Sequence, residues 1–225
     1  MSNEDFEKGV LAWVSFAEKY GADRTFGDFS WETYRVSEAN RMPIAMLKGI
    51  EFKDAFGAYI FGPPGVGKTH AMKARFCEFV NWKVEVFLKG VTTASRAYWV
   101  TTSHYLEAMR SDDHSKRRQL RERAQEASTL FIDDLGTSTR TDWATDQLMQ
   151  LLDFRAERRL QTFITSNLTL EELGAHYGQR LSSRVTALCV PVKLEGGDAR
   201  TEQMTEAIGK LLERVKRVPI PKKKN

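Results

Sequence analysis

The sequence has little of the material from which disulfide scaffolds, metal clusters and membrane spans are built. Its 225 residues include two cysteines, Cys77 and Cys189, which lie far apart, and four scattered histidines. This pattern predicts reduced, buried thiols and excludes a disulfide framework or a Cys/His metal cluster. No apolar run approaches the ~20 residues that a membrane helix needs, and the acidic first residues do not begin a signal peptide. We therefore expect a cytoplasmic protein with no membrane partner.

What the chain does contain is typical of one globular domain. Hydrophobic residues make up 41% of the sequence and charged residues 28%, and this length suffices for one α/β domain with short appendages. The net charge of +4 is moderately basic. Nucleic acid is therefore permitted as a partner without being required by composition.

A glycine-rich stretch carries the strongest functional pattern, because it fits the phosphate-binding sequence G-x-x-x-x-G-K-[ST]. A short apolar run, residues 58–61, precedes it, and apolar residues at helical spacing follow it. A strand, a glycine turn and a helix start in this order predict a phosphate loop, whereas a Gly-Pro surface turn beside a lone lysine would lack such flanks. The residues predicted to bind the nucleotide are Gly62, Pro63, Pro64, Gly65, Val66, Gly67, Lys68, Thr69 and His70.

The chemistry of this loop indicates a nucleoside triphosphate, with ATP and Mg²⁺ as the expected cofactors. The glycines allow backbone N–H groups to approach a polyphosphate, and the start of the following helix presents its positive end to the same charge. Lys68 is expected to reach the β- and γ-phosphates, and the Thr69 hydroxyl is expected to coordinate Mg²⁺.

A second apolar run, Thr129 to Ile132, leads directly into Asp133 and Asp134. This is the pattern of a buried parallel strand that ends at the ligand edge of an α/β sheet. We expect Asp133 to hold Mg²⁺ through its water shell and Asp134 to polarise the water that attacks the γ-phosphate. The alternative is a strand that merely ends in an acidic turn.

Further elements follow from local patterns. Residues 83–88 alternate like a strand, so we interpret 83–96 as an insertion or hairpin. Residues 97–101 are expected to form a central strand, with Ser103 capping a helix over 104–110. Residues 162–167 form another buried strand, Thr169 and Glu172 form a capping box, and a proline in 189–192 predicts an edge strand.

Basic residues gather in two places. Lys116, Arg117, Arg118 and Arg121 lie in a charged helix, which is either a solvated face or a contact for single-stranded DNA. A second group, Arg155 to Arg159, ends the helix expected over 142–159. These cations either suit the helix dipole there or join the first group in a contact for single-stranded DNA. At the N-terminus, amphipathic residues 5–20 either pack on the main domain or offer Phe6, Trp13 and Phe16 to a partner.

The order of these motifs resembles the AAA+ ATPases of the initiator and helicase-loader clade. The motifs that carry the resemblance are the phosphate loop, the strand ending Asp133-Asp134, the strand ending Thr165-Ser166-Asn167, Gly178-Gln179-Arg180-Leu181-Ser182-Ser183-Arg184 and Gly197-Asp198-Ala199-Arg200. The chain is most similar to helicase loaders of the DnaC/DnaI type, with the IstB-type transposition ATPases as siblings. The resemblance implies that Asn167 is a sensor 1 that orients water, that Arg184 is an arginine finger serving a neighbouring subunit, and that Arg200 is a sensor 2 on the nucleotide.

The resemblance also implies a fold and a function. The fold is an α/β P-loop NTPase with a parallel five-stranded sheet flanked by helices. We expect a helical extension over residues 1–47 that could dock a helicase, an ATPase domain over 48–200, and a C-terminal lid helix and basic tail over 201–225. The implied function is ATP-dependent loading of a replicative DNA helicase by a homo-oligomer that binds single-stranded DNA. A transposition helper ATPase and a nucleotide-gated adaptor that does not hydrolyse ATP are the alternatives.

Overall fold

A computed structural model describes residues 3–22, 24–91, 93–137, 139–198, 201, 204–205 and 207–211 of the chain. Within these residues, five parallel strands form one sheet in the order β2-β3-β4-β1-β5. This confirms the predicted five-stranded parallel sheet. The strands are β1 (Gly57–Phe61), β2 (Ala97–Thr101), β3 (Thr129–Leu135), β4 (Gln161–Ser166) and β5 (Cys189–Lys193).

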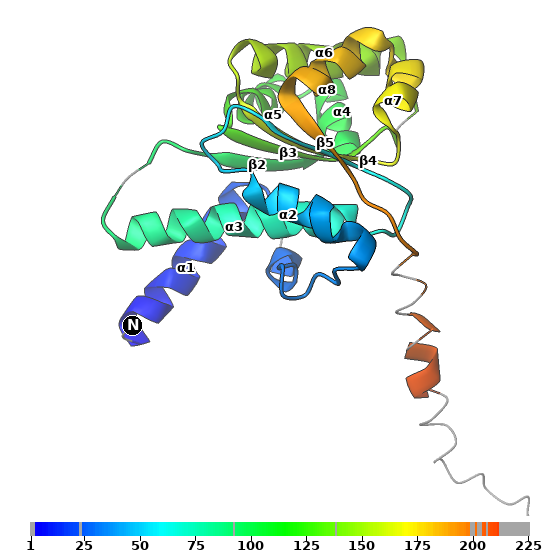
Figure 1. Cartoon of the computed structure of the whole chain (residues 1–225). Coiled ribbons are helices and arrows are strands. Elements are labelled where there is room, and N and C mark those ends of the chain that lie inside the picture. The colour runs from blue at the N-terminus through cyan, green and yellow to red at the C-terminus, as the bar shows by residue number, and fades with distance from the viewer. Residues whose placement is uncertain are drawn as a thin grey trace, which may run out of the picture.

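Helices cover both faces of the sheet (Figure 1). One face carries α1 (Asn3–Lys19), α2 (Arg41–Gly49) and α3 (Lys68–Leu88), together with the short 3₁₀ turns η1 (Arg24–Asp28) and η2 (Glu38–Asn40). The helices on the other face are α4 (Thr102–Arg110), α5 (His114–Glu126), α6 (Asp142–Glu157), α7 (Leu170–Tyr177) and α8 (Gln179–Leu188).

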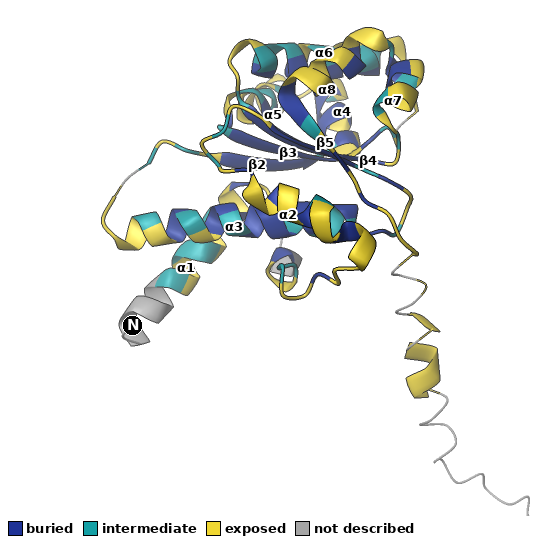
Figure 2. Ribbon diagram, in the orientation of Figure 1, coloured by how far each residue is buried: buried dark blue, intermediate teal, exposed yellow. Residues whose placement is uncertain are grey.

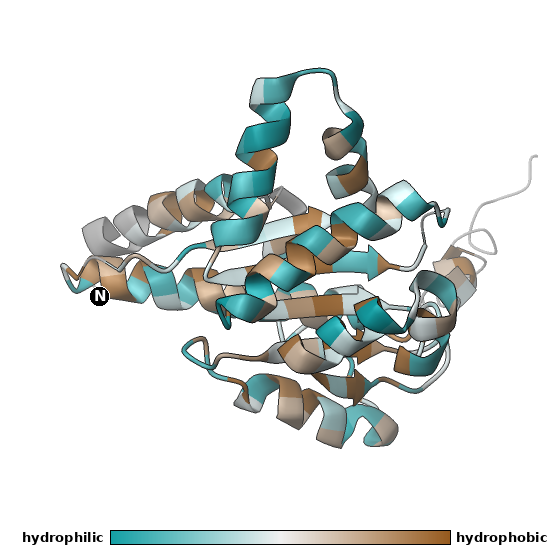
Figure 3. Cartoon of the chain, turned by 90° about the horizontal axis from the view of Figure 1, so that it is seen from above, coloured by the Kyte–Doolittle hydropathy of each residue, from teal (hydrophilic) through white to brown (hydrophobic). Residues whose placement is uncertain are grey.

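The strands form the buried centre of the molecule (Figure 2). Strands and helices both carry hydrophobic and hydrophilic residues (Figure 3). Successive side chains of a strand point to opposite faces. In β1, Ala58 and Ile60 accordingly join the apolar cluster beneath α3, and Tyr59 joins the cluster on the α6 and α8 side. A strand buried on both faces is mostly apolar, which explains the apolar runs in the sequence. The buried polar side chains of β4, such as Gln161 and Thr165, are hydrogen-bonded.

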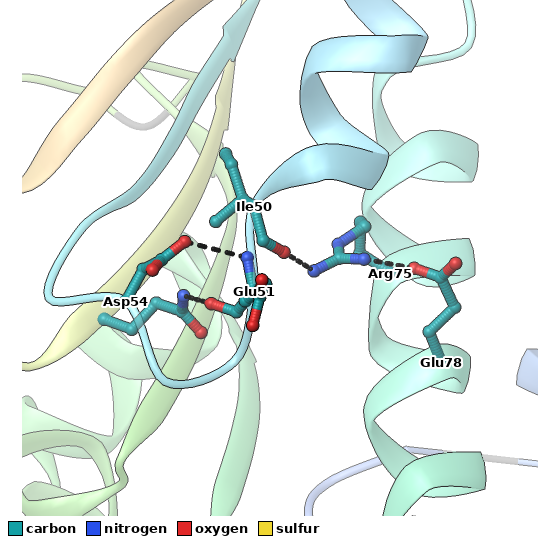
Figure 4. Close-up of polar contacts among 6 residues, drawn as sticks. Ile50, Glu51, Asp54, Arg75 and Glu78 are labelled. Carbon is teal, nitrogen blue, oxygen red and sulfur yellow. Dashed lines mark hydrogen bonds and ion pairs between the residues drawn. The ribbon is translucent and has the colours of Figure 1, made fainter.

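A buried arginine fixes the segment that leads into β1 (Figure 4). The Arg75 guanidinium, on α3, donates a hydrogen bond to the Ile50 carbonyl and pairs with Glu78 one turn along the same helix. Nearby, the Glu51 N–H donates to the Asp54 carboxylate over 2.8 Å, and the Gln161 amide donates to the Glu51 carbonyl over 2.7 Å. These contacts tie the segment to α3 and β4, so they set where β1 enters the sheet.

The expected strand at residues 83–88 is wrong, because α3 continues as a helix to Leu88. Its buried face repeats at helical spacing through Phe76, Val80 and Val84. The misleading alternation came from Lys83-Val84-Glu85-Val86, in which Val84 is buried, while Val86 is half-buried and Phe87 and Leu88 are exposed.

Strand β2 forms an edge of the sheet, so its predicted central position is also wrong. Its free edge is partly covered by the N-terminal segment, since the Trp99 N–H donates to the Tyr20 carbonyl over 2.7 Å. The expected Ser103 cap is wrong as well, because α4 begins two residues earlier and the Thr101 hydroxyl accepts from the His104 N–H. The edge position predicted for residues 189–192 and the capping box of Thr169 and Glu172 are both confirmed.

The N-terminal segment packs on α3, which was one of the two alternatives for it. The Trp13 indole N–H donates to the Asn81 side chain over 2.9 Å, and the Phe16 ring meets Phe87 edge-on at 5.9 Å. Ala17 and Tyr20 join the core under the sheet. The side chain of Phe6 and most of the expected C-terminal helix and tail lie outside the described residues.

Both cysteines are buried free thiols, as predicted, and burial raises the pKa of Cys77 to about 11. None of the helices in the described parts of the chain combines the length and apolar character that crossing a bilayer demands.

Candidate functional site

The carboxyl ends of three neighbouring strands meet at one cleft of about 520 Å³. The phosphate loop follows β1, the acidic pair ends β3, and Asn167 follows β4. Parallel strands bring such residues to the same edge, which is where ligands bind in open α/β sheets. The cleft is lined by Phe29, Pro64, Gly65, Gly67, Lys68, Thr69, His70, Lys73, Asp134, Thr137 and Asn167.

The phosphate loop adopts a backbone conformation that requires glycine at two positions. Gly65 and Gly67 have φ values of 81° and 93°, in the left-handed region that other residues adopt only with strain. A Cβ on Gly67 would also come within 3.0 Å of the Tyr34 ring. With α3 beginning at Lys68, the loop and the first helical turn form the concave set of N–H groups that binds phosphate.

Lys68 lies in the floor of this loop. Its side chain is buried, and the ammonium donates to the carbonyl oxygens of Gly62 over 2.8 Å and Pro63 over 2.7 Å. These contacts hold the cation beside the concave face of the loop, where it can meet the charge of a polyphosphate. The placement agrees with the role predicted for Lys68.

Asp133 lies directly beneath the first turn of α3. Its carboxylate is buried and accepts hydrogen bonds from the hydroxyls of Thr69, over 3.1 Å, and Thr165. Burial raises the pKa of Asp133, the two hydroxyl groups act in the opposite direction, and the neighbouring Asp134 raises the pKa further. Adjacent hydroxyl and carboxylate oxygens are the donor set that suits Mg²⁺, so Thr69 and Asp133 fit the metal that we predict for them.

Asp134 and Asn167 face the cleft from neighbouring strands. Asp134 is exposed and has a φ of 59°, a left-handed backbone for a residue that is not glycine. The Thr137 hydroxyl donates to the Asp134 carbonyl over 2.9 Å, which holds the turn after β3. A carboxylate and an amide therefore line the same cleft as the phosphate loop.

The N-terminal segment supplies a wall of the cleft that the sequence did not reveal. Phe29 lines the cleft and meets the His70 ring edge-on at 5.0 Å. The His70 Nε2 atom lies 3.1 Å from the Thr33 hydroxyl and 3.2 Å from the Ser30 carbonyl oxygen. Burial lowers the pKa of His70. No local pattern could indicate this contact, because it joins residues about forty positions apart.

Arg184, which we predict to serve a neighbouring subunit, does not line this cleft. Arg184 lies on α8, and its guanidinium pairs with the Asp153 carboxylate on α6. Its proposed role in a neighbouring subunit therefore stays a prediction. Arg200 lies outside the described residues.

The basic residues from Arg155 to Arg159 do not form one exposed surface. Arg155 is completely buried, so its predicted place in a DNA-binding surface is wrong. Arg158 and Arg159 are exposed.

On α5, a separate open cleft of about 450 Å³ is lined by His114, Ser115, Arg117, Arg118 and Arg121.

Comparison with known proteins agrees with this geometry. The chain is 26% identical over 163 residues to the replicative helicase loader DnaC of Escherichia coli (strain K12), covering 69% of this chain and 62% of that relative. It is 29% identical over 140 residues to the phage-like element PBSX protein XkdC of Bacillus subtilis (strain 168), covering 58% of this chain and 46% of that protein. The chain thus spans less than two thirds of the length of either relative.

Solved structures share the fold. The crystal structure of the DnaC helicase loader superposes with a TM-score of 0.59 at 19% identity and covers 77% of this chain and 100% of that one. AMPPCP-bound DnaA from Aquifex aeolicus superposes with a TM-score of 0.61 at 16% identity and covers 89% of this chain and 59% of that one. The five-stranded parallel sheet with its flanking helices is therefore a fold that this chain shares with both structures. The family model of the IstB-like ATP binding proteins matches residues 12–207, and this chain belongs to that family.

Proposed function

We propose that this protein is an AAA+ ATPase that hydrolyses ATP and loads a replicative helicase onto single-stranded DNA. The observation that carries the proposal is the convergence of Lys68, Asp134 and Asn167 on one cleft above the Thr69–Asp133 contact. A protein that only binds a nucleotide needs the loop and Lys68. It has no need of a carboxylate and an amide that line the same cleft.

In the proposed reaction the oxygen of a water molecule attacks the γ-phosphorus of ATP. The bond from that phosphorus to the oxygen bridging to the β-phosphorus breaks, and ADP and phosphate form. Asp134 accepts the water proton, Asn167 orients the water, and Lys68 neutralises charge on the β- and γ-phosphates. Mg²⁺, held by Thr69 and Asp133, would supply further positive charge.

The choice of partner rests on similarity to the loader relatives and on two surfaces. The first is α5, whose Lys116, Arg117, Arg118 and Arg121 offer cations for a phosphate backbone. The second is α8, where Arg184 lies away from its own phosphate loop and can serve a second copy of the chain. The N-terminal segment over residues 1–47 is the proposed docking element for the helicase.

A transposition helper ATPase is the second candidate, and the match to the IstB-like family favours it. The same cleft serves both functions, because the partner decides between them. A helper would deliver a transposase to target DNA, whereas a loader would deliver a ring helicase to a single strand.

A retention experiment separates the two candidates. The full chain is immobilised and offered a purified hexameric replicative helicase or a purified transposase from the same cell, each with ATP and with no nucleotide. A loader retains the helicase and responds to ATP. Retention of the transposase alone would assign the protein to the helper class instead.

A further inference from the structure

The acidic pair at the end of β3 depends on a local irregularity of the sheet. Ile132 pairs with Ile164 and Leu135 with Ser166, so Asp133 and Asp134 lie opposite Thr165 alone. This is the arrangement of a β-bulge, which re-aims a side chain and is common beside active sites. In a regular strand the two carboxylates would point to opposite faces of the sheet. With the bulge, Asp133 faces Thr69 while Asp134 reaches the cleft.

Thr165 touches both members of the pair. Its side chain is completely buried, and its hydroxyl oxygen accepts the Asp134 backbone N–H over 2.9 Å. The same hydroxyl contacts the Asp133 carboxylate. An N–H group can only donate, so the single hydroxyl proton is directed to Asp133. One side chain therefore replaces the ladder bond that the bulge removes and orients the neighbouring carboxylate.

Under the proposed function, the hydrogen bond from Thr69 to Asp133 is lost when a nucleotide and Mg²⁺ bind. The Thr69 hydroxyl donates to Asp133 over 3.1 Å, but under the proposed function this hydroxyl turns toward Mg²⁺. Thr165 is then the side chain that continues to hold the Asp133 carboxylate. The left-handed backbone of Asp134, with φ at 59°, also needs a contact that keeps it in place.

We propose that Thr165 is the positioning residue of the acidic pair, holding Asp133 toward the metal position and Asp134 toward the attacking water through one hydroxyl group. The inference rests on the proposed ATPase function and goes beyond it, because the motifs of the chain assign no role to Thr165. Its hydroxyl touches the two acidic residues and no predicted phosphate-binding residue.

The test compares Thr165→Val, which removes the hydroxyl at constant shape, with Thr165→Ser, which keeps it. Thr129→Val is the matched control, because Thr129 is equally buried and bonds Gln161 at the opposite end of β3. We expect the kcat of Thr165→Val to fall by about 10- to 100-fold, as is common when a partner of a metal ligand is removed. The Mg²⁺ concentration for half-maximal turnover should rise, while ATP binding without Mg²⁺ stays within about twofold. Thr165→Ser should recover most of the kcat.

The control distinguishes positioning from simple destabilisation. Thr129→Val should lower the melting temperature in the same way and leave kcat and the Mg²⁺ requirement unchanged. Wild-type kcat and Mg²⁺ requirement in Thr165→Val would overturn the inference. If Thr165→Val does not fold, Thr165→Ala removes the same hydroxyl without a branched side chain and is assessed by the same criteria.

The positioning role of Thr165 can be tested even if the wild-type protein does not hydrolyse ATP. Absence of phosphate release by the wild type would refute the ATPase proposal, and ADP binding then decides the role of Thr165. Mg²⁺ should tighten ADP binding by the wild type and by Thr165→Ser, but not by Thr165→Val. Equal tightening in all three, or none in the wild type, would contradict the positioning role.

Discussion

Lys68 and Arg155 are both buried cations, but their surroundings differ. Lys68 donates to the carbonyls of Gly62 and Pro63 at the wall of the cleft, so its charge is available to a ligand. Arg155 instead donates to the carbonyl of Gln161 and the hydroxyl of Thr162 at the start of β4, and to carbonyls at the end of α5. Position in the fold, rather than charge, separates the functional cation from the structural one.

Lys68→Ala should weaken ATP binding about 100-fold, because it removes a charge-assisted contact to the phosphates and leaves the loop carbonyls without that donor. Titration with a fluorescent ATP analogue measures the loss, and circular dichroism verifies the fold. Lys89→Ala, at the far end of α3, is the control and should bind normally. Wild-type affinity in a folded Lys68→Ala protein would refute the assignment of the loop.

Arg155→Met should lower the free energy of unfolding by about 3 kcal/mol, because it leaves several buried carbonyl groups without a donor. Urea denaturation measures the change. Arg158→Met, on the exposed end of the same helix, should change stability by less than about 0.5 kcal/mol. Similar losses in the two variants would show that Arg155 does not hold α5 against the sheet.

At the scale of elements, patterns set by adjacent residues predicted more than those set by distant ones. The phosphate loop, the acidic end of β3 and the capping box of α7 all depend on short spacings, and each was found at the predicted position. The strand expected at 83–88 was wrong because a strand and an amphipathic helix both accommodate such a short mixed run.

The remaining differences arise from contacts between distant segments. The edge position of β2 depends on pairing order and on Tyr20, which lies about eighty residues earlier in the chain. Burial of Arg155 depends on where the end of α5 lies, and the role of Phe29 depends on the path of the N-terminal segment. Thr165 was part of a predicted strand, but only the bulge opposite it shows which groups its hydroxyl meets.

The contact proposed between helix α5 and single-stranded DNA can be tested by mutation. If it contacts single-stranded DNA, replacing Lys116 and Arg117 with Gln should weaken binding and lower the slope of log affinity against log salt by about 0.7 for each lost phosphate contact. Fluorescence anisotropy at several salt concentrations measures the slope. Lys89→Gln is the control, and affinity that is flat between low and moderate salt would contradict a DNA contact.

For the whole molecule, the role proposed for Arg184 would connect one subunit to another. It pairs with Asp153 on its own surface, with side chains 45% and 31% exposed. An ion pair this exposed contributes little to stability, so its exchange for a phosphate of a neighbouring subunit is inexpensive in free energy. An arginine supplied in this way can accelerate phosphoryl transfer by roughly 10³- to 10⁵-fold.

Arg184→Ala should therefore bind ATP as the wild type does and hydrolyse it about 1,000-fold more slowly. Mixing it with Lys68→Ala protein should restore a fraction of the activity, because an intact arginine meets an intact loop only at mixed interfaces. Arg180→Ala, one turn away on the same helix, is the matched control. Wild-type turnover by Arg184→Ala alone would rule out a shared site.

The central claim is that the cleft at the ends of β1, β3 and β4 hydrolyses ATP. Phosphate release by the purified wild-type chain with ATP and Mg²⁺, in the presence and absence of single-stranded DNA, tests it most directly. Asp134→Asn, which should bind ATP but lack the proton acceptor, sets the background. We expect wild-type release well above that background in at least one of the two conditions. Release no faster than that of Asp134→Asn in both would contradict it.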